Sequence, residues 1–148
     1  MNAGWLRDWL YGGRRRLVAR FWPGRLGDEG ERLAERHLKK LGYKIVARRH
    51  RTPLGELDLI ALDGACLVFV EVKARRSCDA GHPVEAVDAA KQAQLARLAL
   101  AYMKAHHRLE HQARFDVVAV LWAAAGVPPE IVHYRNAFES PGRGRMFG

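Results

Sequence analysis

Asp58, Glu71 and Lys73 are the residues of this sequence whose types and spacing best fit a chemical reaction. Mg²⁺ prefers a few carboxylate oxygens together with several water molecules, so the two acids are candidate metal ligands. An amine beside such an ion can position or deprotonate a water molecule and offset negative charge in the transition state. The three residues therefore predict hydrolysis assisted by Mg²⁺ or Mn²⁺.

A hairpin must bring these residues together. Residues 56–62 alternate polar and apolar side chains, residues 66–73 form a more apolar run, and Asp63-Gly64 between them is a hairpin signal. With these two residues at the centre of the turn, Asp58 faces Phe69. Asp58 then lies diagonally from Glu71, roughly 7–8 Å away at the backbone, which is close enough for both side chains to reach one ion.

Period-two alternation places four charged residues of this hairpin on one side of the sheet: Glu56, Asp58, Glu71 and Lys73. Carboxylates crowded at a half-buried face destabilise it unless they are paired or neutralised, and a divalent cation provides that neutralisation. The alternative is a purely structural network of salt bridges among Glu56, Glu71, Lys73 and Arg75.

Two predicted helices add charged residues to the same place. The first helix spans Gly27 to Leu41, ends at Gly42 and carries Glu31 on an otherwise apolar stripe that also contains Leu41. The second helix runs from about Val84 to His106, and its stripe contains Lys91 together with Leu95, Leu98 and Tyr102. Because ionisable groups at core-facing positions usually either snorkel or act chemically, Glu31 is expected as a further acid and Lys91 as a phosphate contact.

The remaining elements complete one α/β domain. Strands are predicted at residues 43–51, 114–122 and 131–134, which gives the order α-β-β-β-α-β-β. This order predicts a mixed sheet flanked by helices. Asp116 is expected to be a strand-end charge paired with an arginine, with a supporting role near the site as the alternative.

Charge separates the chain into three zones. The 148 residues carry a net charge of +9 and a pI near 10.2, which favours a polyanionic partner such as nucleic acid, with an acidic membrane surface second. Residues 1–26 hold six arginines among tryptophans and leucines, and are expected to be partly disordered or to form a short amphipathic helix. This arm is expected to dock on the domain, grasp nucleic acid or contact a membrane surface. Residues 27–138 form the domain, and residues 139–148 are expected to be disordered.

The sequence also favours a soluble protein of the cytoplasm. It contains no apolar run of the roughly 18 residues needed for a membrane span, and arginines interrupt every apolar run near the N-terminus. Cys66 and Cys78 form neither a disulfide framework nor a zinc motif, which is typical of a reducing compartment.

Longer motifs carry a resemblance to a known family. GELDLIALD (55–63), LVFVEVKAR (67–75) and RFDVV (114–118) closely resemble segments of the YraN family, as do Gly30-Glu31 and the closing Asn136-Ala137-Phe138. The resemblance covers residues 27–138 and departs from the family pattern at Arg48-Arg49, where the family tends to have Arg-Asn. It implies the restriction-endonuclease-like fold with its D…(D/E)xK signature, in a group related to archaeal Holliday junction resolvases.

The resemblance implies Glu31, Asp58, Glu71 and Lys73 as the catalytic quartet. Asp58 and Glu71 are the expected metal ligands, with the Val72 carbonyl as an additional ligand. The expected function is metal-dependent hydrolysis of phosphodiester bonds, in DNA rather than RNA. The analogy with resolvases suggests that the DNA is structured or branched and that the protein forms a homodimer. The alternative is a nucleic-acid-binding adaptor without catalysis. The residues expected to contact the phosphate backbone are Arg48, Arg51, Arg75, Arg76 and Lys91. Glu56 and Gln94 are expected to support the site.

Overall fold

The computed structural model describes residues 23–76 and 89–139. Along the chain its elements are α2 (Pro23–Lys40), β1 (Lys44–Thr52), β2 (Gly55–Asp63), β3 (Cys66–Arg76), α3 (Ala89–Ala105), β4 (Ala113–Trp122) and β5 (Glu130–Phe138). The predicted order of helices and strands, and with it the mixed α/β fold class, is confirmed. The predictions for the arm up to residue 22, for residues 77–88 and for the tail from residue 140 lie outside the described residues.

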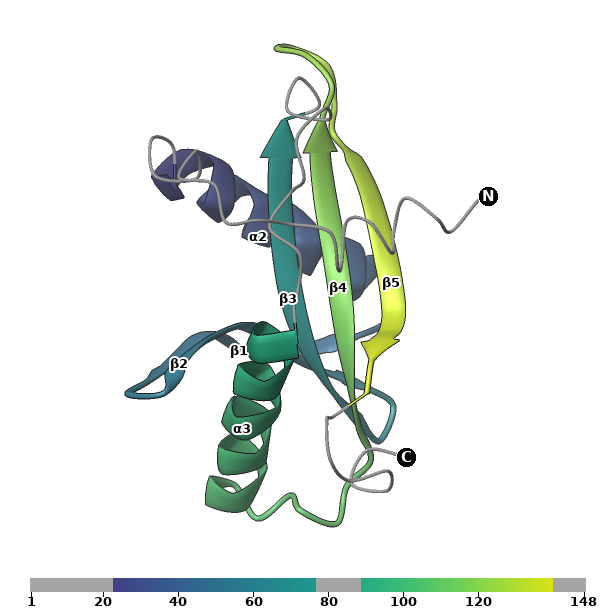
Figure 1. The fold of residues 1–148 in the computed structure, drawn as a ribbon. Coiled ribbons are helices and arrows are strands. Elements are labelled where there is room, and N and C mark those ends of the chain that lie inside the picture. The colour runs from purple at the N-terminus through teal and green to yellow at the C-terminus, as the bar shows by residue number, and fades with distance from the viewer. Residues whose placement is uncertain (1–22, 77–88, 140–148) are drawn as a thin grey trace.

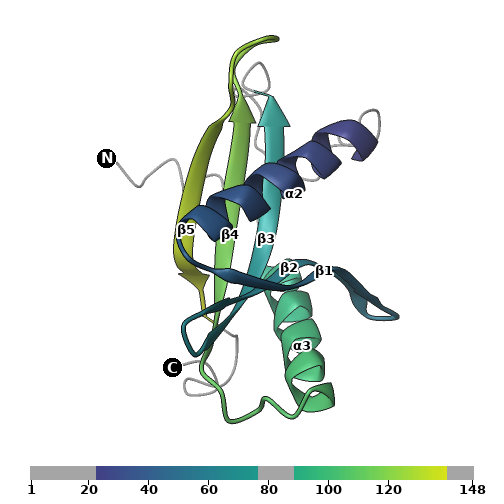
Figure 2. The same ribbon diagram turned by 180° about the vertical axis from the view of Figure 1, so that it is seen from behind.

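One five-stranded sheet, ordered β1-β2-β3-β4-β5, organises the described chain. Its strands are antiparallel to their neighbours except for β3 and β4, which run parallel. A parallel pair needs a crossover connection, and α3 lies in that connection. Helix α2 crosses one face of the sheet, and α3 lies on the opposite side (Figures 1 and 2).

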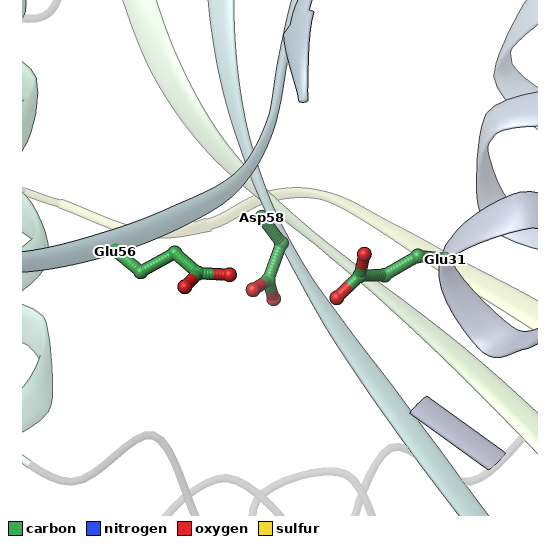
Figure 3. Close-up of side chains that lie close together, drawn as sticks. All are labelled: Glu31, Glu56 and Asp58. Atoms are coloured by element: carbon green, nitrogen blue, oxygen red, sulfur yellow. The ribbon is translucent and has the colours of Figure 1, made fainter. Parts of the chain in front are cut away.

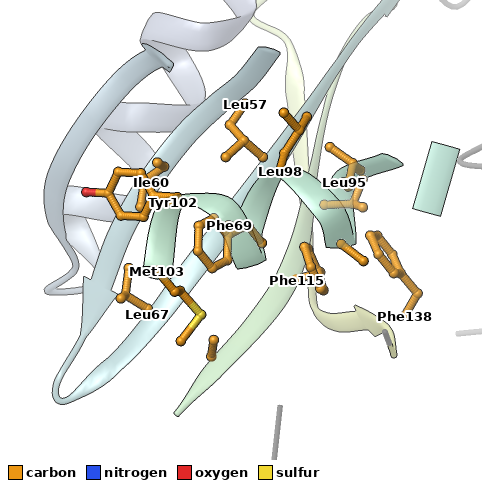
Figure 4. Close-up of a cluster of buried hydrophobic side chains, with 14 of the residues drawn as sticks. Leu57, Ile60, Leu67, Phe69, Leu95, Leu98, Tyr102, Met103, Phe115 and Phe138 are labelled. Carbon is orange, nitrogen blue, oxygen red and sulfur yellow. The ribbon is translucent and has the colours of Figure 1, made fainter. Parts of the chain in front are cut away.

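Each helix closes its own hydrophobic core. On the α3 side, the helix buries Leu95, Leu98 and Tyr102 against Phe69 and Phe115 of the sheet (Figure 4), as the predicted stripe requires. On the α2 side, the buried residues from the helix and the sheet are Ala34, Leu38, Val68, Val70, Val118 and Val120. Because both faces of β3 and β4 are covered, these strands are nearly continuous apolar runs.

Helix α2 begins earlier than predicted and ends one residue before the predicted Leu41. It starts at Pro23 instead of Gly27, since proline fits the first turn of a helix, where its missing N–H costs nothing. Its last residue is Lys40, and Gly42, the predicted stop, follows with a φ of 91° in the left-handed region, while Tyr43 donates its N–H to the Leu38 carbonyl at 3.0 Å. Leu41 follows the last helical residue and is 54% exposed, so its predicted place on the core stripe is wrong.

The register of the β2–β3 hairpin differs from the predicted one. Asp63 pairs with Cys66, so the two central turn residues are Gly64 and Ala65, and Gly64 takes the left-handed conformation with φ 59°. Ile60, and not Asp58, is therefore the partner of Phe69. The prediction placed the turn one residue too early, because Asp-Gly is a turn signal wherever glycine supplies a positive φ.

Candidate functional site

Asp58 lies where strands β2 and β3 separate. The pairing between them ends at Leu59 and Val70, and one step further along the ladder would place Asp58 opposite Glu71. At this point the Asp58 carboxylate accepts a hydrogen bond from the backbone N–H of Val72 at 2.8 Å. The Asp58 side chain thus accepts from the Val72 N–H of β3, which no longer pairs with the backbone of β2.

Strand β2 twists sharply at Asp58. Leu57 packs in the core on the α3 side, whereas Leu59 packs in the core on the α2 side. In a regular strand these two residues would face the same side, so the predicted period-two alternation fails here. Arg49, which the pairs on either side of it place opposite Asp58, has a φ of 46° in the left-handed region. The irregular backbone at both positions turns Asp58 toward groups on neighbouring elements.

Three carboxylates converge at this point (Figure 3). Oxygen atoms of Glu31 from α2 and of Glu56 and Asp58 from β2 all lie within 4.8 Å of one another, and the Asp58 side chain lies between the other two. All three residues are partly buried. Glu56 is thus closer to the centre of the cluster than the supporting position predicted for it.

Glu71 and Lys73 lie beside Asp58 on β3. Their side chains are only 7% and 10% exposed, and Lys73 Nζ lies 3.3 Å from Glu71 Oε1. Lys91, near the start of α3, approaches the same Glu71 oxygen at 3.9 Å. Glu71 is also close enough to Asp58 for its charge to raise the pKa of the Asp58 carboxyl. The structure therefore brings together the whole predicted quartet and Lys91, from α2, β2, β3 and α3.

Cations surround every acid of this cluster except Asp58. Arg49 pairs with Glu31 at 2.8 Å and Arg51 pairs with Glu56 at 2.8 Å, while Glu71 has its two lysines. Within residues 23–76 and 89–139, no arginine or lysine forms an ion pair with Asp58. Part of the predicted structural salt-bridge network therefore exists, and Arg75 donates a hydrogen bond to the Ala74 carbonyl.

The electrostatics of Asp58 reflect this arrangement. Burial raises the pKa of the Asp58 carboxyl well above its usual value, the charges of Glu71 and Glu31 raise it further, and the Val72 N–H opposes the shift. Glu35, one helical turn beyond Glu31, shows the opposite case: its hydrogen bond with Arg48 lowers its pKa to about 2. A cation bound at this site would therefore stabilise the ionised form of Asp58.

The donor set fits a hard divalent cation. Partly buried carboxylates that approach one another without enough compensating charge are ligands of the kind that Mg²⁺ and Mn²⁺ bind. Glu31, Glu56 and Asp58 are the residues that would hold such an ion, with Glu71 beside them. The Val72 carbonyl stays a prediction.

The residues predicted to contact phosphates are spread more widely. Arg51 lies beside the cluster, through its ion pair with Glu56. Arg48 instead pairs with Glu35 on α2. Arg75 and Arg76 occupy the end of β3. Gln94 donates from its side-chain amide to the Leu54 carbonyl at 2.9 Å, so it fastens the β1–β2 turn to α3.

A second polar cluster, on the α2 side of the sheet, was only partly foreseen. Asp116 is completely buried and accepts a hydrogen bond from Arg114 at 3.0 Å, which confirms its predicted pairing with an arginine. Its predicted place at a strand end is wrong, because it lies inside β4. It also bonds His133 at 2.8 Å and the backbone N–H of Asn136 at 3.0 Å, and His133 in turn contacts His37 of α2 at 3.3 Å. Neither histidine carried a sequence signal, because their spacing matches no motif.

Arg49 and Asp28 are the site residues that sequence reasoning missed. The Arg49 guanidinium bonds Glu31 and Asp28, which stand three residues apart on α2. An available signal was the pair of acids one helical turn apart on α2.

None of the helices within the described residues is both long and apolar enough to cross a membrane.

Comparison with known proteins identifies relatives of this chain. It is 50% identical over 111 residues to a UPF0102 protein of Beutenbergia cavernae, covering 75% of this chain and 93% of that protein. It is 48% identical over 99 residues to a UPF0102 protein of Chlorobaculum tepidum, covering 67% and 77%. A family model described as "Uncharacterised protein family UPF0102" matches residues 30–120, from Gly30 beside the first acid of the site to Val120 in β4. The chain therefore belongs to the UPF0102 family, the YraN family that its motifs resemble.

Proposed function

We propose that this protein is a metal-dependent nuclease that hydrolyses phosphodiester bonds in DNA. The observation that carries the proposal is the cluster of Glu31, Glu56 and Asp58 oxygens within 4.8 Å, next to the buried pair of Glu71 and Lys73. A structural ion-pair network explains the pairs with arginine and lysine. It does not explain a partly buried Asp58 that lies among acids with no cation of its own in the described chain.

Each residue of the site has a distinct role in the proposed reaction. Asp58, Glu31 and Glu56 would hold Mg²⁺ or Mn²⁺, and Glu71 would complete the acidic side of the site. When bound, the ion polarises the scissile phosphate and stabilises the leaving oxygen. Lys73 would orient the attacking water molecule through its ammonium group, which Glu71 holds in place at 3.3 Å.

The exposed cations would hold the nucleic acid. Arg51, whose side chain is 73% exposed, pairs with Glu56, and Lys91, whose side chain is 34% exposed, approaches Glu71. Contacts of this kind with phosphates fix the position of a nucleic acid but do not select a sequence. The net charge of +9 adds a sequence-independent attraction that weakens as salt is added.

Cleavage assays test the proposal. The full chain is incubated with Mg²⁺ or Mn²⁺ and with linear, single-stranded, flapped and four-way DNAs, beside Asp58→Asn and Lys73→Met. We expect both substitutions to reduce cleavage by about 10²-fold or more, because each removes a group that acts on the reacting atoms. Asp63→Asn is the matched control, since Asp63 lies on the same strand but pairs with Arg114 at 2.9 Å, away from the site. Cleavage that persists in Asp58→Asn, or is lost equally in Asp63→Asn, contradicts the proposal.

A nucleic-acid-binding adaptor is the second candidate. It is favoured by the ion pairs that already compensate Glu31, Glu56 and Glu71, since a site of this kind can be stable as a scaffold. The same panel distinguishes the two candidates. Binding that survives Asp58→Asn and Lys73→Met, without cleavage of any DNA by the unmodified protein, supports the adaptor.

A further inference from the structure

Arg49 is the cation nearest the acid that α2 contributes to the proposed metal site. Its Nε donates to Glu31 Oε2 at 2.8 Å, and its terminal nitrogen bonds Asp28. Glu31 also belongs to the carboxylate cluster with Glu56 and Asp58. The Glu31 carboxylate therefore pairs with the Arg49 guanidinium and also belongs to the cluster where a divalent cation would bind.

The backbone at Arg49 is unfavourable for arginine. Its φ of 46° lies in the left-handed region, which costs most residues other than glycine, asparagine and aspartate of the order of 1 kcal/mol. The residue is opposite Asp58, where β2 twists. A strained position that directs a charged side chain onto a site residue points to a role for that side chain.

Arg49 is also accessible. Its side chain is 41% exposed, whereas that of Glu31 is 21% exposed. An exposed ion pair of this kind contributes little net stability, so the guanidinium can leave it at small cost. A phosphate offers an arginine the same bidentate acceptor geometry as a carboxylate.

We propose that Arg49 is a built-in counter-charge on Glu31 that competes with the divalent cation and is drawn away when a phosphate of the nucleic acid binds. In the absence of substrate, Arg49 pairs with Glu31 and thereby weakens metal binding. A phosphate that takes the guanidinium releases Glu31 as a ligand, so DNA and metal each favour the binding of the other. This inference rests on the proposed function, because it assigns a regulatory residue to the same metal site.

The first test measures Mn²⁺ binding without any reaction. Mn²⁺ is titrated into the full chain and into Arg49→Asn by calorimetry or by electron paramagnetic resonance. Asparagine tolerates the left-handed backbone and removes the guanidinium, so the fold is retained while the competitor is lost. We expect Arg49→Asn to bind Mn²⁺ about two- to fivefold more tightly, the range that the strength of an exposed ion pair allows.

A matched control and a double mutant make the test specific. Arg48→Asn removes the neighbouring arginine, which pairs with Glu35 and not with the cluster, and should leave Mn²⁺ affinity unchanged. In the Glu31→Gln background, Arg49→Asn should have no further effect, because its target is gone. Melting temperatures of all four variants verify that each protein is folded.

The outcomes separate this inference from the proposed function. Equal or weaker Mn²⁺ binding by Arg49→Asn overturns the role of Arg49 and leaves the nuclease proposal standing. Absence of Mn²⁺ binding by every variant at millimolar concentration overturns both. If Arg48→Asn tightens Mn²⁺ binding to the same degree as Arg49→Asn, the effect comes from the lost positive charge in general, and the specific role of the Arg49–Glu31 contact is refuted. A short DNA duplex should tighten Mn²⁺ binding to the unmodified protein and not to Arg49→Asn.

Discussion

Replacing Gly30 with alanine should loosen the contact that positions Glu31. Helix α2 approaches β3 closely at Gly30, where an added Cβ would lie 2.7 Å from the Cβ of Ala74 and 3.8 Å from the Trp122 ring. Carbon atoms pack best at about 3.5–4.0 Å, so the helix or the strand must move by about 1 Å. Glu31 is the next residue, and it would move away from Asp58 with the helix.

Two opposing effects set the size of the change in stability. Glycine to alanine inside a helix gains roughly 0.5–1 kcal/mol, because alanine loses less backbone entropy on folding. Overpacking a close contact costs about 1–3 kcal/mol. The contact at 2.7 Å involves two groups that cannot rotate away, so the cost should exceed the gain. We expect Gly30→Ala to lower the free energy of unfolding by about 1 kcal/mol.

Gly27 offers an internal control on the same helix. A Cβ added there meets nothing within 4 Å, so Gly27→Ala should instead raise the free energy of unfolding by roughly 0.5–1 kcal/mol. The assay is urea denaturation followed by circular dichroism, with Mn²⁺ titration as a second measurement. Gly30→Ala should also bind Mn²⁺ more weakly, and Ala74→Gly added to it should restore part of that affinity. If Gly30→Ala is as stable as Gly27→Ala, the close approach of α2 and β3 does not limit the site.

Three further substitutions test the electrostatics. Asp58→Asn should stabilise the metal-free protein. Because the pKa of Asp58 is raised in the folded state, ionisation of Asp58 destabilises the fold, so the gain in melting temperature should grow as pH rises from 4 to 8. His37→Gln should have the opposite pH profile. Because burial lowers the pKa of His37, the unfolded chain binds more protons than the folded protein. The unmodified protein should therefore lose stability relative to the variant as pH falls through 6.5 toward 5. Asp116→Asn should cost about 3 kcal/mol in urea denaturation, because it leaves Arg114 and His133 around a buried group that no longer carries charge. A flat difference with pH for either of the first two, or a change below about 1 kcal/mol for the third, would contradict the assigned contacts.

Local patterns were sufficient to predict the elements of the fold. Apolar stripes and strand alternation gave the order of helices and strands, because these periods follow from backbone geometry and burial. The apolar runs of β3 and β4 reflect coverage on both faces, which the structure confirms with cores on the α2 and α3 sides. The start of α2 at Pro23 and the extension of β5 to Phe138 were missed, since periodicity fades at the ends of elements.

The site was predicted in its members but not in its geometry. Glu31, Asp58, Glu71 and Lys73 do converge, yet the reason is the twist at Asp58 and not the regular alternation that predicted it. That twist coincides with the left-handed backbone at Arg49, which lies opposite Asp58 on β1. Arginine adopts this conformation less readily than glycine or asparagine, so the residue type gave no signal of the irregularity.

The proposed site lies almost entirely within one continuous stretch of chain. Its acids and Lys73 come from α2, β2 and β3. Between β1 and β3 the strands follow one another with antiparallel pairing, whereas the parallel partner β4 joins only after the α3 crossover. Contacts between neighbours in sequence form faster than those that must close a long loop. On a ribosome, β2 and β3 with Glu56, Asp58, Glu71 and Lys73 would therefore pair before β4 had been synthesised, whereas α2 with its Glu31 completes its core only when Val118 and Val120 of β4 join.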